Sequence, residues 1–148
     1  MLYNIPSIIS PELIKVIMEM GHGDDIIIAD ANFPAASLAQ RHLYIGAKIP
    51  ELMNAILRYM PLDQFVEYPV ALMDIGDRPI PPNWPLYIEE LKKHPHVEGL
   101  DSLDKIEMME RQAFFDRTKK AYAVITTQDT TASANIILKK GCVFDWQE

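Results

Sequence analysis

Short apolar runs of strand character alternate with helical patterns along the whole chain, and this alternation restricts the fold more than any other feature. Its clearest member is Ile26-Ile27-Ile28-Ala29, which is apolar on both faces and therefore suits a strand buried inside a sheet. Similar runs occur at residues 43–45, 69–73, 105–108, 122–127 and 135–138. This alternation, without an internal repeat, predicts an α/β fold, a three-layer α/β/α sandwich around a mostly parallel sheet. The fold is expected to be Rossmann-like, but the chain lacks the Gly-x-Gly-x-x-Gly dinucleotide motif.

Helical patterns fill the intervals between these strands. Ser10-Pro11-Glu12 supplies an N-cap, a first-turn proline and a first-turn acid, so a helix is expected over 11–20. Further helices are predicted from Pro50, over about 86–93, and around 111–118. Residues 76–85 hold four prolines and are expected to form an irregular loop, whereas segment 34–40 fits neither pattern. His94-Pro95-His96 is interpreted as a solvated turn.

Size and charge restrict the class of protein. The chain has 148 residues, so residues 1–148 are expected to form one domain, and its 14 basic and 21 acidic residues give a net charge of −7. That charge repels nucleic acid and anionic lipid, and no apolar run approaches the roughly 20 residues that span a bilayer. The start of the chain lacks a secretory signal and Cys142 is the single cysteine, so a cytoplasmic location is expected.

The segment around the first buried run holds the clearest candidates for chemistry. His22 lies between two glycines, and its reference pKa near 6.5 suits proton transfer at neutral pH. Asp30 follows the strand at its carboxyl end, where α/β folds place their sites. Each has a structural alternative, since His22 could be an exposed turn residue and Asp30 could cap a turn. Their spacing is a weak metal signal, so no metal site is predicted.

Arg111 is a third candidate. Its planar guanidinium could reach a polar ligand while the ring of Phe115, one helical turn later, packs beneath it. The alternative is a surface ion pair with Glu107 or Glu110, which would contribute about 0 to 1 kcal/mol. A serine hydrolase is excluded because the chain has no Gly-x-Ser-x-Gly elbow.

Three segments together resemble the L-fucose mutarotase family, whose relatives include D-ribose pyranase. The first runs from Ser10-Pro11-Glu12-Leu13 through Glu19-Met20-Gly21-His22-Gly23-Asp24 to Ala29-Asp30-Ala31-Asn32-Phe33-Pro34. The others are Arg111-Gln112-Ala113-Phe114-Phe115-Asp116-Arg117 with Lys120-Ala121-Tyr122-Ala123, and Asn135-Ile136-Ile137-Leu138-Lys139-Lys140-Gly141. The resemblance covers nearly the whole chain and is least specific over residues 74–103.

The resemblance implies a cofactor-free isomerase that exchanges the α and β anomers of L-fucose. It implies that His22 is the proton donor and that Asp30, Arg111 and the triplet Ser133-Ala134-Asn135 contact the sugar. Asp30 would either orient the imidazole of His22 or accept a sugar hydroxyl. It also implies a homo-oligomer, a decamer of two pentameric rings, with sites near subunit interfaces.

Two departures from the family pattern leave other functions open. Bacterial members carry tyrosine-glycine-asparagine where this chain has Ser133-Ala134-Asn135, and Asn32 replaces a histidine found in some relatives. The lost tyrosine bears on sugar preference, so a D-ribose pyranase that exchanges pyranose and furanose forms is the first alternative. A non-catalytic monosaccharide-binding protein, in which His22 and Asp30 serve only as hydrogen-bonding groups, is the second.

Overall fold

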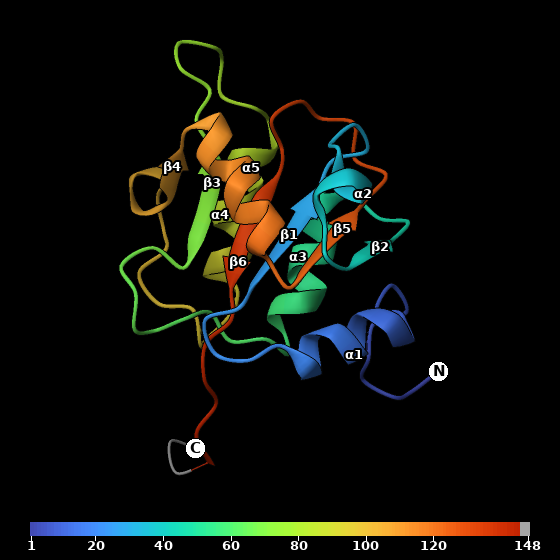
Figure 1. The fold of residues 1–148 in the computed structure, drawn as a ribbon. Helices are drawn as coiled ribbons and strands as arrows, with labels where there is room; N and C mark the ends of the chain where they lie inside the picture. The colour runs from blue at the N-terminus through green and yellow to red at the C-terminus, as the bar shows by residue number, and fades with distance from the viewer. Residues whose placement is uncertain (146–148) are drawn as a thin grey trace.

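A six-stranded sheet forms the centre of the computed structural model, which describes residues 1–145 (Figure 1). Its strands are β1 (Asp25–Ala29), β2 (His42–Tyr44), β3 (Val70–Met73), β4 (Glu107–Met109), β5 (Ala123–Thr126) and β6 (Ile136–Lys139). They lie in the order β2-β5-β1-β6-β3-β4. All pairings are parallel except those of β6, which runs antiparallel to β1 and β3. The prediction of a mostly parallel sheet is confirmed.

Helices cover both faces of this sheet. They are α1 (Pro11–Glu19), α2 (Ala35–Leu38), α3 (Ile49–Leu57), α4 (Asn83–Lys92) and α5 (Arg111–Lys120), with a 3₁₀ turn, η1, at Leu103–Lys105. Buried side chains of α1, α3 and α4 pack on one face, and those of α2 and α5 on the other. In Figure 1, α5 lies in front of the sheet with α3 and α4 behind it. The predicted three-layer sandwich is confirmed.

Strand β1 shows why the sequence folds into three layers. Ile26 and Ile28 point into the core beneath α1, α3 and α4, whereas Ile27 and Ala29 point into the core beneath α5. All four side chains are fully buried. Burial of an isoleucine side chain stabilises a fold by about 1.5–3 kcal/mol, so a strand apolar on both faces is favoured only at the centre of such a sheet.

The middle of the chain differs from the sequence-based expectation. Helix α4 begins at Asn83, three residues earlier than expected, and Pro85 lies in its first turn. A proline is tolerated there because the first turn has no partners for its N–H groups. The strand expected at 105–108 was also misplaced, because η1 occupies 103–105 and β4 begins at Glu107. Segment 34–40 contains the short helix α2.

The interpretation of the two neighbouring histidines as a solvated turn was wrong for one of them. His94 is only 7% exposed, and its Nε2 atom has no hydrogen-bond partner within residues 1–145. Burial, with the nearby His96, lowers the pKa of His94. His94 is therefore a neutral packing residue rather than a ligand at the surface.

The direction of the strands gives the sheet two distinct edges. At one, here called the carboxyl edge, β1 to β5 end and β6 begins; the opposite edge is called the amino edge. Within the described part of the chain, no helix is long and apolar enough to cross a membrane.

Candidate active site

Four of the residues expected at the site surround one pocket of about 340 Å³ at the carboxyl edge. Asp30 follows β1, Arg111 follows β4, and Ser133 and Asn135 immediately precede β6. The sheet thus brings together residues more than 100 positions apart in the sequence. The pocket is open to solvent and is also lined by the aromatic rings of Phe33 and Phe115.

Asp30 is the acid at the base of this pocket. It is 6% exposed, and its carboxylate accepts the backbone N–H of Asn32 at 2.8 Å. Its own backbone N–H is donated to the side-chain oxygen of Asn135, also at 2.8 Å. Burial raises the pKa of Asp30 and outweighs the hydrogen bonds from Asn32, Phe33 and Asn135 that act in the opposite direction. Asp30 is therefore a stronger base than an exposed carboxylate.

Arg111 approaches the pocket from the first turn of α5. Its guanidinium carbon lies 4.9 Å from the ring centroid of Phe115, as the sequence-based reading anticipated. The alternative ion pairs do not form, because Glu107 pairs with Arg117 and Glu110 caps the helix. The guanidinium is stacked but its N–H donors remain available to a ligand.

The pocket also receives a residue that the sequence did not single out. Arg78, from the proline-rich loop after β3, lines the same pocket. Its Nε donates to the carbonyl of Ile75 at 2.9 Å, which holds the side chain against its own loop. No local pattern marks this arginine, because the topology of the sheet alone brings its loop to Asp30.

The triplet before β6 is held from beneath by α4. Ser133 has a left-handed backbone with φ of 56°, and its carbonyl accepts the indole N–H of Trp84 at 3.1 Å. The hydroxyl of Tyr87 donates to the carbonyl of Ala134 at 2.5 Å. Ala134 is fully buried and lies under the pocket rather than lining it, so only its backbone serves the site. Trp84 and Tyr87 were not predicted, since they bear no motif.

A second buried acid, Asp129, lies in the loop between β5 and β6, and its pKa is shifted in the opposite direction to that of Asp30. Burial raises its pKa, but N–H groups of Thr131, Asn83 and Ile49 that donate to its carboxylate outweigh that effect and lower the pKa overall. Asp129 is thus a structural anion.

His22 lies far from this pocket in its own chain. It precedes β1 whereas Asp30 follows it, and five strand residues separate their ends by about 16 Å. The expectation that Asp30 could orient the imidazole is therefore wrong within one chain. The imidazole instead contacts Asp63, with 3.0 Å between its Nε2 and Oδ1 of the carboxylate. Sequence reasoning missed Asp63, which is 41 positions away and in no recognisable pattern.

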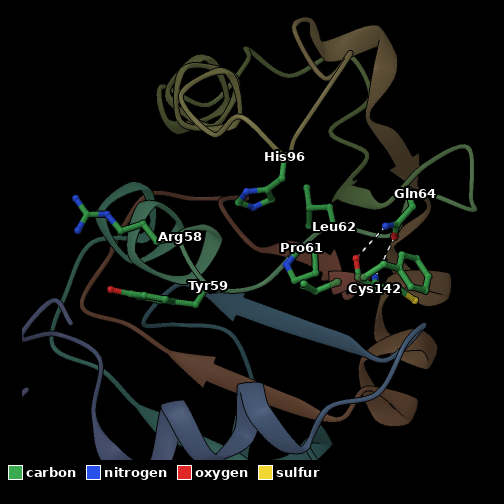
Figure 2. Close-up of a pocket in the computed structure, with 9 residues that line it drawn as sticks. Arg58, Tyr59, Pro61, Leu62, Gln64, His96 and Cys142 are labelled. Carbon is green, nitrogen blue, oxygen red and sulfur yellow. Dashed lines mark hydrogen bonds between the residues drawn. The ribbon is translucent and has the colours of Figure 1, made fainter. Parts of the chain in front are cut away.

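Another hollow, of about 420 Å³, lies at the amino edge (Figure 2). Figure 2 shows the ring of His96 above Pro61 and Leu62, and the amide of Gln64 paired with the backbone of Cys142. The side chains of residues 1–145 that line this hollow include no carboxylate. Among residues 1–145, no three histidine, cysteine or acidic side chains are grouped as metal ligands.

Comparison with known proteins identifies the family. Residues 3–143 match the family described as the RbsD / FucU transport protein family. The chain belongs to this family. Its sequence is 42% identical over 144 residues to the L-fucose mutarotase of Actinobacillus pleuropneumoniae, covering 95% of this chain and 96% of that one.

Two solved structures of the RbsD / FucU family share the fold. The fucose mutarotase of Streptococcus pneumoniae in complex with L-fucose is 43% identical, with a TM-score of 0.88 over 97% of this chain and all of that one. RbsD of Bacillus subtilis complexed with D-ribose is 26% identical, with a TM-score of 0.64 over 94% of this chain and 98% of that one. The greater likeness is thus to the fucose enzyme.

Proposed function

We propose that this protein is an L-fucose mutarotase, a carbohydrate isomerase that exchanges the α and β anomers of the sugar. The observation that carries the proposal is the pocket of Asp30, Arg111, Ser133 and Asn135, in a chain 43% identical to a fucose mutarotase whose structure contains L-fucose. The pocket offers a carboxylate acceptor, guanidinium donors and apolar rings. These groups suit a small polyol with one apolar face.

The reaction needs few groups. As the bond between C1 and the ring oxygen breaks, its electron pair goes to the ring oxygen, which takes a proton. The anomeric hydroxyl loses its proton and becomes the aldehyde oxygen. Rotation about the exocyclic bond and the reverse steps then form the other anomer. In this proposal the neutral ring of His22 takes the proton that the anomeric hydroxyl loses, and the resulting imidazolium gives it to the ring oxygen. Asp30 accepts a sugar hydroxyl, and Arg111 holds the remaining hydroxyls.

Because His22 and Asp30 lie at opposite edges of one chain, the proposed site requires two copies of the chain. His22 of one copy would reach the sugar held in the pocket of the next. Exposed apolar side chains beside His22, including Phe65 and Val66, support an interface at the amino edge. A head-to-tail contact between two different edges forms a ring when its rotation closes, and such a ring is the unit of the proposed decamer of two pentameric rings.

The proposed activity is tested by magnetisation-exchange NMR on L-fucose with a catalytic amount of the protein. We expect exchange between the α and β signals above the rate in buffer. D-Ribose serves as the parallel substrate, and faster exchange of its pyranose and furanose signals alone would favour the pyranase alternative. Saturable sugar binding without faster exchange of either sugar would favour a binding protein.

A further inference from the structure

We infer that Asp63 is a positioning residue for His22, and that the two side chains act as one carboxylate–imidazole dyad. This inference rests on the proposed function, in which His22 carries the proton. It adds a residue that neither the family resemblance nor the pocket at the carboxyl edge contains. Its basis is the contact between the two side chains at the amino edge.

The geometry defines which ring nitrogen binds Asp63. Nε2 of His22 lies 3.0 Å from Oδ1 of Asp63, and the same oxygen accepts the backbone N–H of Phe65 at 2.9 Å. An oxygen that already accepts one N–H belongs to a carboxylate that acts as an acceptor. Nε2 must therefore carry the proton, which leaves Nδ1 of the neutral ring as the atom that exchanges a proton with the sugar.

Burial separates the roles of the two side chains. The Asp63 side chain is 3% exposed, whereas the imidazole is 46% exposed. Asp63 is also anchored through its backbone, since its N–H donates to the carbonyl of Lys139 at 2.9 Å. The Phe65 ring packs against the imidazole in a T-shaped arrangement, with 5.3 Å between ring centroids. A fixed, buried acceptor thus holds an exposed ring in one orientation.

Other charged groups near the turn are engaged elsewhere. Asp24 accepts the backbone N–H of Gly21, and Lys140 donates to the carbonyls of Ile17 and Met20. Lys139 pairs with Asp25, which also binds Arg117. Among the described residues, Asp63 is therefore the carboxylate that contacts the imidazole. When Nδ1 takes up a proton, the Asp63 carboxylate faces the resulting cation and stabilises it.

The first arm of the test uses the wild-type protein, so its result does not require any variant to fold. Two-dimensional ¹H–¹⁵N NMR of the histidine rings at neutral pH should show the His22 proton on Nε2. A neutral ring with its proton on Nδ1 would overturn the dyad. This result is independent of whether the protein accelerates anomer exchange.

The second arm compares Asp63→Asn with Asp24→Asn. Both remove one negative charge close to His22, but only Asp63 contacts the imidazole. We expect Asp63→Asn to lower kcat for L-fucose exchange by about 10- to 100-fold, with KM within about two-fold, and to populate the Nδ1-protonated ring. Asp24→Asn should retain the wild-type rate and the Nε2 proton.

The outcomes separate the dyad from the proposed function. If wild-type protein exchanges the anomers and Asp63→Asn, folded by circular dichroism, matches it in kcat and ring protonation, the dyad is wrong while the function stands. Equal losses in both asparagine variants would assign the effect to charge alone and would also reject the dyad. If wild-type protein does not exchange the anomers, the proposed function fails, and the ring protonation still tests the geometry.

Discussion

Replacement of His22 with alanine is expected to slow L-fucose anomer exchange by about a hundred- to ten-thousand-fold, the usual contribution of a positioned acid–base group. The fold should survive, because the imidazole is half exposed and lies in a turn between two glycines. Loss of its contact with Asp63 should cost no more than about 1 kcal/mol of unfolding free energy. Exchange NMR and urea denaturation of the same preparation measure both effects.

His96→Ala is the matched control for this variant. His96 also lies at the amino edge and lines the hollow shown in Figure 2, but its ring neighbours that of His94, with 5.9 Å between ring centroids, whereas the Asp63 carboxylate contacts His22. We expect this variant to exchange L-fucose at the wild-type rate. Full activity in His22→Ala, or an equal loss in His96→Ala, would contradict the role given to His22.

Asp30→Asn is expected to change activity and stability in opposite directions. The asparagine lacks the charge that is proposed to accept a sugar hydroxyl, and a hydrogen bond to a charged group contributes about 1.5–3 kcal/mol. This corresponds to about a 10- to 150-fold lower kcat/KM. The variant should nevertheless be more stable than wild type at pH 7, by about 0.5–2 kcal/mol, because it removes a buried charge.

The difference in unfolding free energy between Asp30→Asn and wild type should depend on pH, in the sense set by the direction of the Asp30 pKa shift. The pKa of Asp30 is higher in the folded than in the unfolded chain, so the folded state holds the proton more tightly. Wild-type stability therefore falls as the pH rises from the unfolded pKa, near 3.8, through the folded one. The gain of Asp30→Asn should be absent below this window and complete above it.

Asp129→Asn provides the opposite case. The pKa of Asp129 is lowered, so its ionised form stabilises the fold at neutral pH and its contribution is lost as the pH falls through the folded pKa. We expect Asp129→Asn to be less stable than wild type at pH 7. Urea denaturation of both variants at pH 3 and pH 7 checks the two signs. A loss of stability at pH 7 in Asp30→Asn would contradict the account of its burial.

Local sequence patterns predicted the start of α1 and the buried strand β1, because each depends on residues close together in the chain. Ser10 caps α1 as expected, since its side chain accepts the N–H of Leu13. The buried run of β1 marked the centre of the sheet, and its end marked the position of Asp30. In each case the signal and the structure it specifies lie within a few residues of one another.

Features that depend on distant contacts could not be predicted in this way. His22 and Asp30 are eight positions apart in the sequence, yet the extended β1 places them at opposite edges of the sheet. Asp63 lies beside His22 because its segment pairs with the end of β6, where Leu62 bridges to Lys140. Arg78 lines the pocket because the loop after β3 lies at the carboxyl edge, where β3 pairs with β4 and β6. Pro85 was read as a helix breaker, because a proline in a first turn cannot be told from one in a loop without its neighbours.

The central claim, that each site uses His22 of one copy and Asp30 of another, is tested most directly by mixing two defective variants. His22→Ala and Asp30→Asn are dissociated together in equal amounts, reassembled, and assayed by exchange NMR on L-fucose. In a random assembly, half of the sites receive an intact His22 from one copy, and half of those receive an intact Asp30 from the other. About a quarter of wild-type activity is therefore predicted. A mixture no more active than the average of the two separate variants would contradict the shared site.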